Sequence, residues 1–200
     1  MLLPYLNKGI IEAGCDEAGR GCLAGPVYAA AVILPGDYKN ALLNDSKQLS
    51  MKQRYALRET IMNDAVAWAV ASVDNDEIDR MNILKASFHA MNKAVSQLKT
   101  TPEFLLIDGN KFINEYGIPY QCIVKGDAKY MSIAAASILA KTFRDDFMNE
   151  QHHLYPLYGW DSNKGYPTPK HYKAIEAYGI TPLHRKSYNL NRQLELDIES

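Results

Sequence analysis

The sequence predicts an α/β fold in which helices flank a mixed central sheet. Segments of strand character come first along the chain and helical segments collect later, and neither an internal repeat nor a low-complexity linker divides them. The chain has 200 residues, of which 47% are hydrophobic, and this is enough for one compact core. We therefore expect a single domain over residues 1–200, with a C-terminal helical part over roughly residues 160–200.

The first part of the chain is expected to supply three strands and a helix. An apolar run over residues 10–16 and another over residues 27–34 flank a polar, glycine-rich break, which indicates a hairpin. Ser50 and Gln53 form a capping box that opens a helix ending near residue 64. The pattern over residues 65–73 predicts the third strand.

Two helices and a short strand are expected next. Asp76 is expected to open a short helix, and residues 83–98 a longer one. The longer helix carries apolar residues at helical spacing, which we expect in the core: Leu84, Phe88, Met91 and Val95. After Pro102, a short buried strand over residues 104–107 delivers Asp108 into a glycine-containing turn.

The last part is expected to be mainly helical. A strand over residues 121–124 ends in Lys125-Gly126-Asp127, and a helix follows from about Met131 to His153. Thr168 as N-cap and Pro169 at the first helical position predict a helix to about residue 178. The tail from Asn189 is predicted to form a short helix.

Composition narrows the class of protein. Lys and Arg total 22 against 23 for Asp and Glu, so the net charge of −1 does not by itself indicate a polyanionic partner. Three cysteines without a C-x-x-C pair favour neither a disulfide framework nor a zinc ribbon, and fit a reducing compartment. The N-terminus does not resemble a signal peptide, and the apolar stretches are shorter than a membrane span. We expect a cytoplasmic protein without membrane contact.

Four acidic residues stand at or beside the ends of expected strands: Asp16, Glu17, Asp108 and Asp127. A charge at such a place is costly unless something positive compensates it, and a divalent cation would do so. Oxygen ligands without a nearby histidine or thiolate favour Mg²⁺ or Mn²⁺ over zinc. Four acids could hold two such ions, in the arrangement used for phosphodiester displacement. The alternative is that they are ordinary solvated loop acids.

A glycine loop follows the first two acids. Adjacent strand residues point to opposite faces, so Asp16 and Glu17 can share one site only if the strand distorts there. Gly19-Arg20-Gly21 supplies that freedom, lets backbone N–H groups approach a nucleic acid, and places Arg20 where it could neutralise a phosphate. The same glycines formally fit a dinucleotide-binding fingerprint, but a strand follows them where that motif needs a helix.

The run over residues 15–27, Cys-Asp-Glu-Ala-Gly-Arg-Gly-Cys-Leu-Ala-Gly-Pro-Val, closely resembles the signature of the ribonuclease HII family. Further blocks agree in order with that family, over residues 45–50, 107–110, 125–129, 134–141, 163–166 and 184–188. The resemblance spans nearly the whole chain. The ribonuclease HIII branch is similar, but it typically carries Gly-Lys-Gly in the loop and an additional N-terminal domain, for which this chain has no room.

The resemblance implies a ribonuclease H-like fold whose metal-binding and catalytic carboxylates are Asp16, Glu17, Asp108 and Asp127. It also implies that Gly19, Arg20 and Gly21 read the 2′-hydroxyl of a ribonucleotide through backbone groups, together with Tyr166. Without the resemblance, a tyrosine between Gly165 and Pro167 would be interpreted as a loop anchor.

The implied reaction is endonucleolytic hydrolysis of RNA in RNA–DNA hybrids and of the bond 5′ to a ribonucleotide embedded in duplex DNA. Two divalent ions, Mn²⁺ or Mg²⁺, would give 3′-hydroxyl and 5′-phosphate products, without a protein nucleophile. Such an enzyme would serve ribonucleotide removal and RNA primer processing. Lys47 and Lys125 are candidate phosphate contacts, with solvated surface residues as the alternative.

Basic residues gather near the C-terminus, and Glu176 is the single acid between residues 164 and 192. The basic residues and histidines of this stretch are Lys164, Lys170, His171, Lys173, His184, Arg185, Lys186 and Arg192. We interpret them as a candidate duplex-binding surface, with an ordinary solvated helix face as the alternative. The tail over residues 193–197 faintly resembles peptides that bind bacterial sliding clamps, although it lacks the usual final aromatic. We expect a monomer.

Two other functions remain open at this point. Another nuclease of the same fold class would also need clustered acids, but not a loop and a tyrosine that read a ribose. A non-catalytic protein that binds RNA–DNA hybrids would use the acids structurally, although acids without metal would repel a phosphate backbone.

Overall fold

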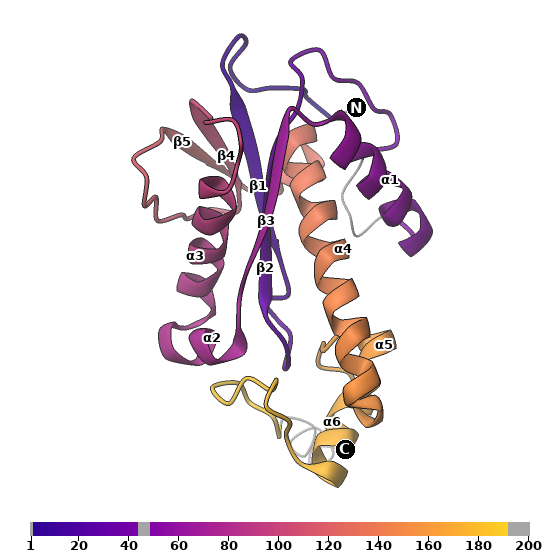
Figure 1. Ribbon diagram of the computed structural model, residues 1–200. Coiled ribbons are helices and arrows are strands. Elements are labelled where there is room, and N and C mark those ends of the chain that lie inside the picture. The colour runs from indigo at the N-terminus through magenta and orange to yellow at the C-terminus, as the bar shows by residue number, and fades with distance from the viewer. Residues whose placement is uncertain (1, 44–48, 192–200) are drawn as a thin grey trace.

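The computed structural model describes residues 2–43 and 49–191. Its centre is a five-stranded sheet in the order β3-β2-β1-β4-β5 (Figure 1). The strands are β1 (Glu12–Ala18), β2 (Val27–Ile33), β3 (Ala67–Val73), β4 (Phe104–Asp108) and β5 (Tyr120–Ile123). The first three strands pair antiparallel, whereas β4 is parallel to both β1 and β5. The prediction of a mixed sheet is confirmed.

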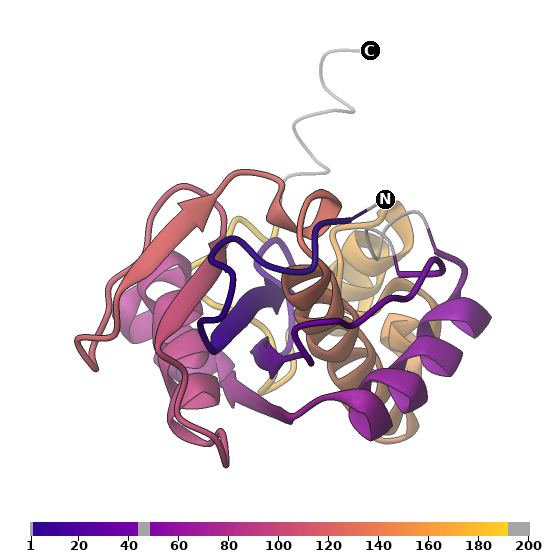
Figure 2. The same ribbon diagram turned by 90° about the horizontal axis from the view of Figure 1, so that it is seen from above.

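Helices cover both faces of this sheet (Figures 1 and 2). The helices are α1 (Met51–Asp64), α2 (Asn75–Met81), α3 (Ile83–Ser96), α4 (Met131–Leu154), α5 (Trp160–Asn163) and α6 (Pro169–Tyr178), with short 3₁₀ turns η1 (Gly126–Ala128) and η2 (Pro156–Tyr158). Helices α2 and α3 lie on one face, and α1 and α4 lie on the other. The longest helix, α4, runs alongside the central strands and continues beyond them to α5 and α6 (Figure 1).

Strand alternation divides the core between the two faces. Ala13 and Cys15 of β1 pack in a cluster with Met91 of α3, whereas Ala18 packs with Ile138 of α4. Between these positions Gly14 allows α4 to lie directly on β1, because a Cβ at Gly14 would stand 2.2 Å from the backbone carbon of Ser132. The N-terminal half of α4 therefore runs along β1, and the middle of the helix reaches Gly19, where a Cβ would stand against Arg144.

The local signals for helix ends are confirmed in most places. Ser50 caps α1 with both halves of the capping box, and Thr168 caps α6 by accepting a hydrogen bond from the His171 N–H. The N-cap of α2 is Asp74 and not Asp76, because the Asp74 side chain accepts the Glu77 N–H.

One prediction of a core residue is wrong. Leu84 is 38% exposed, whereas Phe88, Met91 and Val95 of the same stripe are buried. The chain enters α3 from α2 through Asn82, whose φ of 72° is left-handed, and the buried stripe of α3 begins only at Ala86. In the first turn of α3, Ile83 still packs against this core cluster, whereas Leu84 points away from it.

The C-terminal part returns to the loop that follows β1. Leu23 N–H donates to Gly165 O (2.8 Å), Gly25 N–H donates to Leu183 O (2.8 Å), and Ala24 forms an isolated bridge with His184. The loop over residues 19–26 is thus held against two segments that lie far from it in the sequence.

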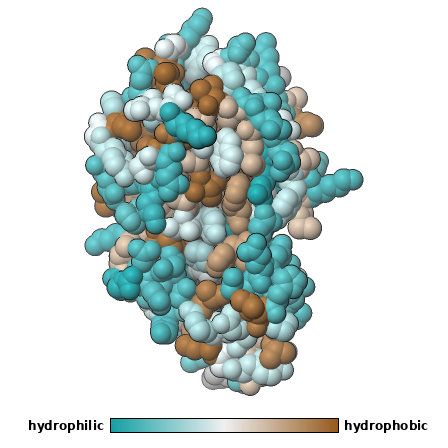
Figure 3. All heavy atoms as spheres, in the orientation of Figure 1, coloured by the Kyte–Doolittle hydropathy of each residue, from teal (hydrophilic) through white to brown (hydrophobic). Residues whose placement is uncertain are grey.

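On the face seen in Figure 3, hydrophilic residues cover most of the surface, and hydrophobic residues form scattered groups. In the described residues, no helix is long and apolar enough to cross a membrane. The tail over residues 193–197 and most of the predicted C-terminal helix lie outside the described residues.

Candidate active site

A pocket of about 270 Å³ opens at the C-terminal end of β1. It is lined by Asp16, Glu17, Ala18, Gly19, Arg20, Gly21, Arg54, Asp108, Ser137, Lys141 and Tyr166. A larger hollow of about 480 Å³ lies at the other end of β1, but Glu12 is the single acid in its lining. The chemistry that the sequence predicts therefore belongs to the smaller pocket.

The register of two parallel strands brings Asp16 and Asp108 together. Strands β1 and β4 pair up to Cys15 opposite Ile107, so Asp16 and Asp108 occupy the next position on each strand. Residues at matching positions of neighbouring strands project to the same face of a sheet. The Gly126 N–H then orients Asp108 by donating to its Oδ1 at 2.7 Å.

Glu17 reaches the pocket without the strand distortion that we expected, so that expectation is wrong. The pairing of β1 with β2 runs without a break from Gly14 to Ala18. Pairing with β4 ends earlier, at Cys15, so the edge of β1 next to Glu17 is open. Glu17 lines the pocket, and Arg20 Nη1 is 3.0 Å from its Oε1.

These carboxylates are crowded and withdrawn from water. Burial raises the pKa of Asp16 well above its usual range, and the charges of Glu17 and Asp108 raise it further. A hydrogen bond with Ser137 opposes this rise in the Asp16 pKa. Burial also raises the pKa of Glu17, although Arg20 acts against it. A bound cation would relieve both the repulsion and the cost of burial.

The donor atoms suit a hard divalent cation, because carboxylate oxygens are the ligands that Mg²⁺ and Mn²⁺ prefer. In residues 2–43 and 49–191, no three His, Cys, Asp or Glu side chains already stand in an arrangement that could hold a metal ion. The carboxylate donors thus fit Mg²⁺ or Mn²⁺ in kind. To surround an ion, the acidic side chains would have to rotate about their own bonds.

Asp127 lies near the pocket but does not line it. It is buried in η1, the short turn whose Gly126 N–H orients Asp108. Lys125, which precedes that turn with a φ of 55°, is exposed and is likewise absent from the lining. Lys47 lies outside the described residues.

The glycine loop lines the pocket as expected, and its two glycines differ in their surroundings. Gly19 has a φ of 98°, and a Cβ there would stand 2.1 Å from Nε of the buried Arg144. At Gly21 a Cβ would meet no atom within 4 Å. Gly19 is therefore required by the protein itself, whereas the space at Gly21 is open to a ligand.

Tyr166 faces the same pocket from the loop between α5 and α6. Lys141 Nζ lies 5.5 Å and Arg144 Cζ 5.7 Å from the centre of its ring, within the range of cation–π contacts. Burial, with a contribution from the hydrogen-bonded neighbour Cys22, raises the pKa of the Tyr166 phenol to about 12. The ring is 37% exposed, so part of it remains accessible.

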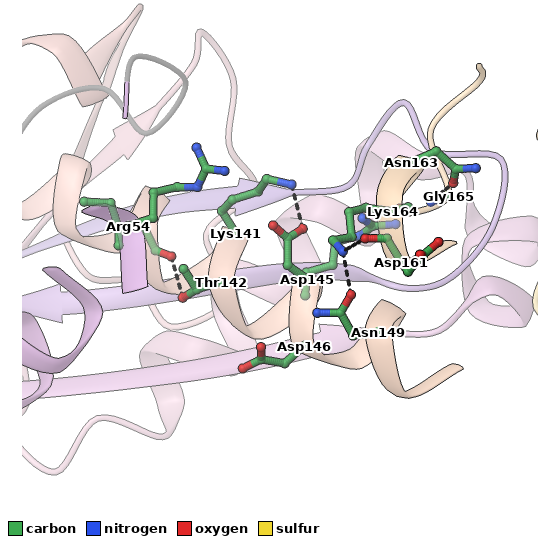
Figure 4. A network of polar contacts seen from close by, with 12 residues as sticks. Arg54, Lys141, Thr142, Asp145, Asp146, Asn149, Asp161, Asn163, Lys164 and Gly165 are labelled. Carbon is green, nitrogen blue, oxygen red and sulfur yellow. Dashed lines mark hydrogen bonds and ion pairs between the residues drawn. The ribbon is translucent and has the colours of Figure 1, made fainter. Parts of the chain in front are cut away.

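Three polar lining residues were not proposed from the sequence: Arg54, Ser137 and Lys141. Ser137 and Lys141 are four residues apart on α4 and so share one face of that helix. Lys141 Nζ is held by Asp145 Oδ1 at 2.6 Å (Figure 4). The i, i+4 spacing was the available signal, but it became informative only once α4 was known to lie against β1.

The basic surface expected near the C-terminus is wrong for four of its members. Lys164, His171, His184 and Arg185 are buried. The reason is that other groups of the protein satisfy their hydrogen bonds. Lys164 Nζ, for example, donates to Asn149 Oδ1 (2.5 Å) and to the Asp161 carbonyl (Figure 4). In the described part of the set, the exposed cations are Lys170, Lys173 and Lys186.

Comparison with known proteins agrees with this geometry. The family model of ribonuclease HII matches residues 13–191. A ribonuclease HII of Phocaeicola vulgatus is 65% identical over 199 residues, which cover 98% of this chain and 99% of the relative. The crystal structure of ribonuclease H2 from Pyrococcus horikoshii superposes with a TM-score of 0.76 at 27% identity, over 94% of this chain and 99% of that one. The ribonuclease HII of Archaeoglobus fulgidus, solved in complex with PCNA, also gives 0.76 at 27% identity, over 90% and 96% of the two chains.

Proposed function

The chain belongs to the ribonuclease HII family, and on that basis we propose that the pocket at the end of β1 is its active site. The chain is an endonuclease that hydrolyses RNA in RNA–DNA hybrids. We propose further that it nicks duplex DNA on the 5′ side of a single embedded ribonucleotide, leaving a 3′-hydroxyl and a 5′-phosphate. One observation carries the location of the site: the parallel register places Asp16 and Asp108 side by side, with the glycine loop around the same pocket.

Asp16, Glu17 and Asp108 would hold divalent ions, Mg²⁺ or Mn²⁺, and we propose that Asp127 joins them from η1. Such ions, when bound, would lower the pKa of an attacking water and offset the charge of the leaving oxygen. Two ions are proposed because the acids number four. Buried acids that repel one another in the absence of metal support this proposal.

The remaining lining residues would bind and orient the substrate. The glycine loop and Tyr166 would recognise the ribonucleotide, Gly19 and Gly21 through their backbone and Tyr166 through its ring and phenol. Arg20, which is half exposed beside Glu17, would neutralise a phosphate. Lys47 and Lys125 are proposed as outer phosphate contacts.

A protein partner and a location in the cell are part of the proposal. Because the relative from Archaeoglobus fulgidus was solved with PCNA, we propose a sliding-clamp contact for this chain through residues 193–197. Deletion of that tail should then weaken retention on the clamp in a pull-down, and unchanged retention would remove the proposal. We also propose that the enzyme acts as a monomer in the cytoplasm.

The test is cleavage of a DNA duplex that carries one ribonucleotide, with Mg²⁺ or Mn²⁺ and with EDTA. We expect a metal-dependent nick on the 5′ side of the ribonucleotide and no nick in an all-DNA duplex. Equal cutting of the all-DNA duplex would indicate another nuclease of this fold, and no cutting of either would indicate a hybrid-binding protein.

A further inference from the structure

The wholly buried Arg185 holds the glycine loop from behind. Its guanidinium donates to three carbonyl oxygens of residues 19–26, two of them in the glycine loop: Nη2 to Gly19 O at 2.7 Å, Nη1 to Arg20 O at 2.8 Å and Nε to Gly25 O at 3.0 Å. The Tyr188 phenol adds a second donor to Arg20 O at 2.7 Å. Arg185 Nη1 also donates to the Tyr188 oxygen at 3.1 Å, so the two side chains act together.

A buried cation is expensive unless it is compensated, and here the compensation comes from the loop itself. In the described chain, no carboxylate lies within ion-pair distance of Arg185, and its hydrogen bonds go to the three carbonyls and the phenol. The backbone of Arg185 is fixed as well, because its N–H donates to Leu23 O at 2.8 Å. This arrangement ties the loop conformation to one side chain.

The consequence for the pocket follows from peptide geometry. In a trans peptide the C=O and the N–H point in opposite directions, and the chain has no cis peptide in its described part. The carbonyls of Gly19 and Arg20 point toward Arg185, so the N–H groups of Arg20 and Gly21 point away from it. Both residues line the pocket, and in the described part of the chain neither amide donates to any group.

We propose that Arg185 and Tyr188 are positioning residues that determine specificity for ribonucleotides. By drawing two loop carbonyls inward they present the amides of Arg20 and Gly21 to the pocket as paired hydrogen-bond donors for the ribose 2′-hydroxyl oxygen. This inference rests on the proposed function. It assigns recognition of the sugar in part to Arg185 and Tyr188, whereas the four acids would bind metal.

The test uses two matched tyrosines. Tyr188→Phe removes a phenol that donates to a carbonyl of the glycine loop, whereas Tyr158→Phe removes a phenol that donates to Gly179 O (2.9 Å), outside the loop. Each change is made in the Asp108→Asn protein, which prevents cleavage, and the Kd is measured by fluorescence anisotropy. The two ligands are an all-DNA duplex and the same duplex with one ribonucleotide.

The preference is the Kd for the all-DNA duplex divided by the Kd for the ribonucleotide duplex. We expect Tyr188→Phe to reduce this ratio by about tenfold, or to abolish it if it is smaller than that. The Kd for the all-DNA duplex should not change. Tyr158→Phe should leave both Kd values unchanged. An unaltered preference in Tyr188→Phe, or an equal loss of affinity for both duplexes, would overturn the inference.

Arg185→Lys is the second variant, since it keeps the charge but lacks the planar fork whose separate nitrogens reach the carbonyls of Gly19, Arg20 and Gly25. We expect it to reduce the preference at least as much as Tyr188→Phe does, and a full preference in this variant would overturn the inference. Cleavage by the unsubstituted protein separates the two ideas: absence of any nick would contradict the proposed function, whereas a normal nick with unaltered preference in the variants would contradict this inference alone.

Discussion

At the scale of single residues, the site carries a cost in stability. Asp16 is 5% exposed, and burial together with Glu17 and Asp108 raises its pKa. An acid whose pKa is raised in the folded state destabilises the protein once it ionises, so stability declines as the pH rises above the unfolded pKa. Without metal at neutral pH, Asp16 therefore weakens the fold that its function requires.

Asp16→Asn should consequently stabilise the metal-free protein while it abolishes cleavage. We expect the free energy of unfolding, measured in urea with EDTA at pH 7, to rise by about 1 kcal/mol. Asp37→Asn, a change at an exposed acid, serves as the control and should leave this free energy unchanged. A less stable Asp16→Asn protein would contradict the electrostatic account of the pocket.

The two glycines of the loop should respond differently to the same substitution. Gly19→Ala places a Cβ against Arg144 at a φ of 98°, so we expect a loss of at least about 2 kcal/mol in unfolding free energy. Gly21→Ala meets no neighbour within 4 Å, so we expect unchanged stability but a raised KM for the ribonucleotide duplex. The measurements are urea unfolding and steady-state cleavage. An equal loss of stability in both variants would contradict the conclusion that the fold requires Gly19 but not Gly21.

At the scale of elements, helix α6 is tied to the pocket by buried histidines. Because Thr181 N–H donates to His184 Nδ1 (2.9 Å), the proton of His184 is on Nε2, and it points to His171 Nε2 at 3.2 Å. The Trp160 Nε1–H donates to the same His171 nitrogen at 3.1 Å, so the His171 proton is on Nδ1, which donates to Tyr166 O at 3.0 Å. This chain of bonds requires both histidines to be neutral.

Acid should therefore weaken this part of the molecule. Burial, and then the charge of His171, lowers the pKa of His184 from 6.5 to about 4. Protonation then favours the unfolded state, so the contribution of His184 to stability is lost as the pH falls from about 6.5 to about 4, by up to about 3 kcal/mol.

The measurement is the difference in unfolding free energy between the natural chain and His184→Asn, which keeps an acceptor for Thr181 but cannot titrate. We expect this difference to shrink steadily between pH 6.5 and 4. A difference that stays constant over that range would show that His184 does not have a lowered pKa.

Site residues that local patterns mark could be predicted from the sequence, whereas those that depend on packing between distant elements could not. Asp108 could be placed at a strand end because apolar runs and glycine turns mark such ends locally, whereas β1 continues two residues beyond Asp16 to Ala18. The contribution of Ser137 and Lys141 could not be foreseen, since it depends on α4 lying against β1 through Gly14. Arg185 looked like a surface cation because the carbonyls that bury it lie about 160 residues earlier in the chain.

At the scale of the whole molecule, the C-terminal part and the sheet are interlocked. Residues 19–26 contact both the loop of Tyr166 and the segment of Arg185, and Met148 of α4 packs with Leu23 and Trp160 in one cluster. Such contacts favour cooperative unfolding of the sheet and the C-terminal part as one domain.

Single-tryptophan variants test this prediction. Trp68 lies in β3, whereas Trp160 is buried in the C-terminal part. Trp160→Phe therefore keeps a fluorescent reporter in the sheet, and Trp68→Phe keeps one in the C-terminal part. Because Trp160 is fully buried and hydrogen-bonded, Trp160→Phe should be the less stable variant. We expect each variant to show one urea transition whose midpoint by fluorescence equals its midpoint by circular dichroism. Non-coincident midpoints within one variant would indicate that the C-terminal part unfolds separately.

Catalysis by this chain should depend on the carboxylates at the end of β1. The most direct test is the rate of nicking 5′ to a single ribonucleotide by Asp108→Asn, compared with the natural chain and with Asp37→Asn, in the presence of Mg²⁺ or Mn²⁺. We predict that Asp108→Asn loses at least about 1,000-fold in kcat while Asp37→Asn keeps full activity. Normal activity in Asp108→Asn would place the active site elsewhere on the molecule and contradict its assignment to this pocket.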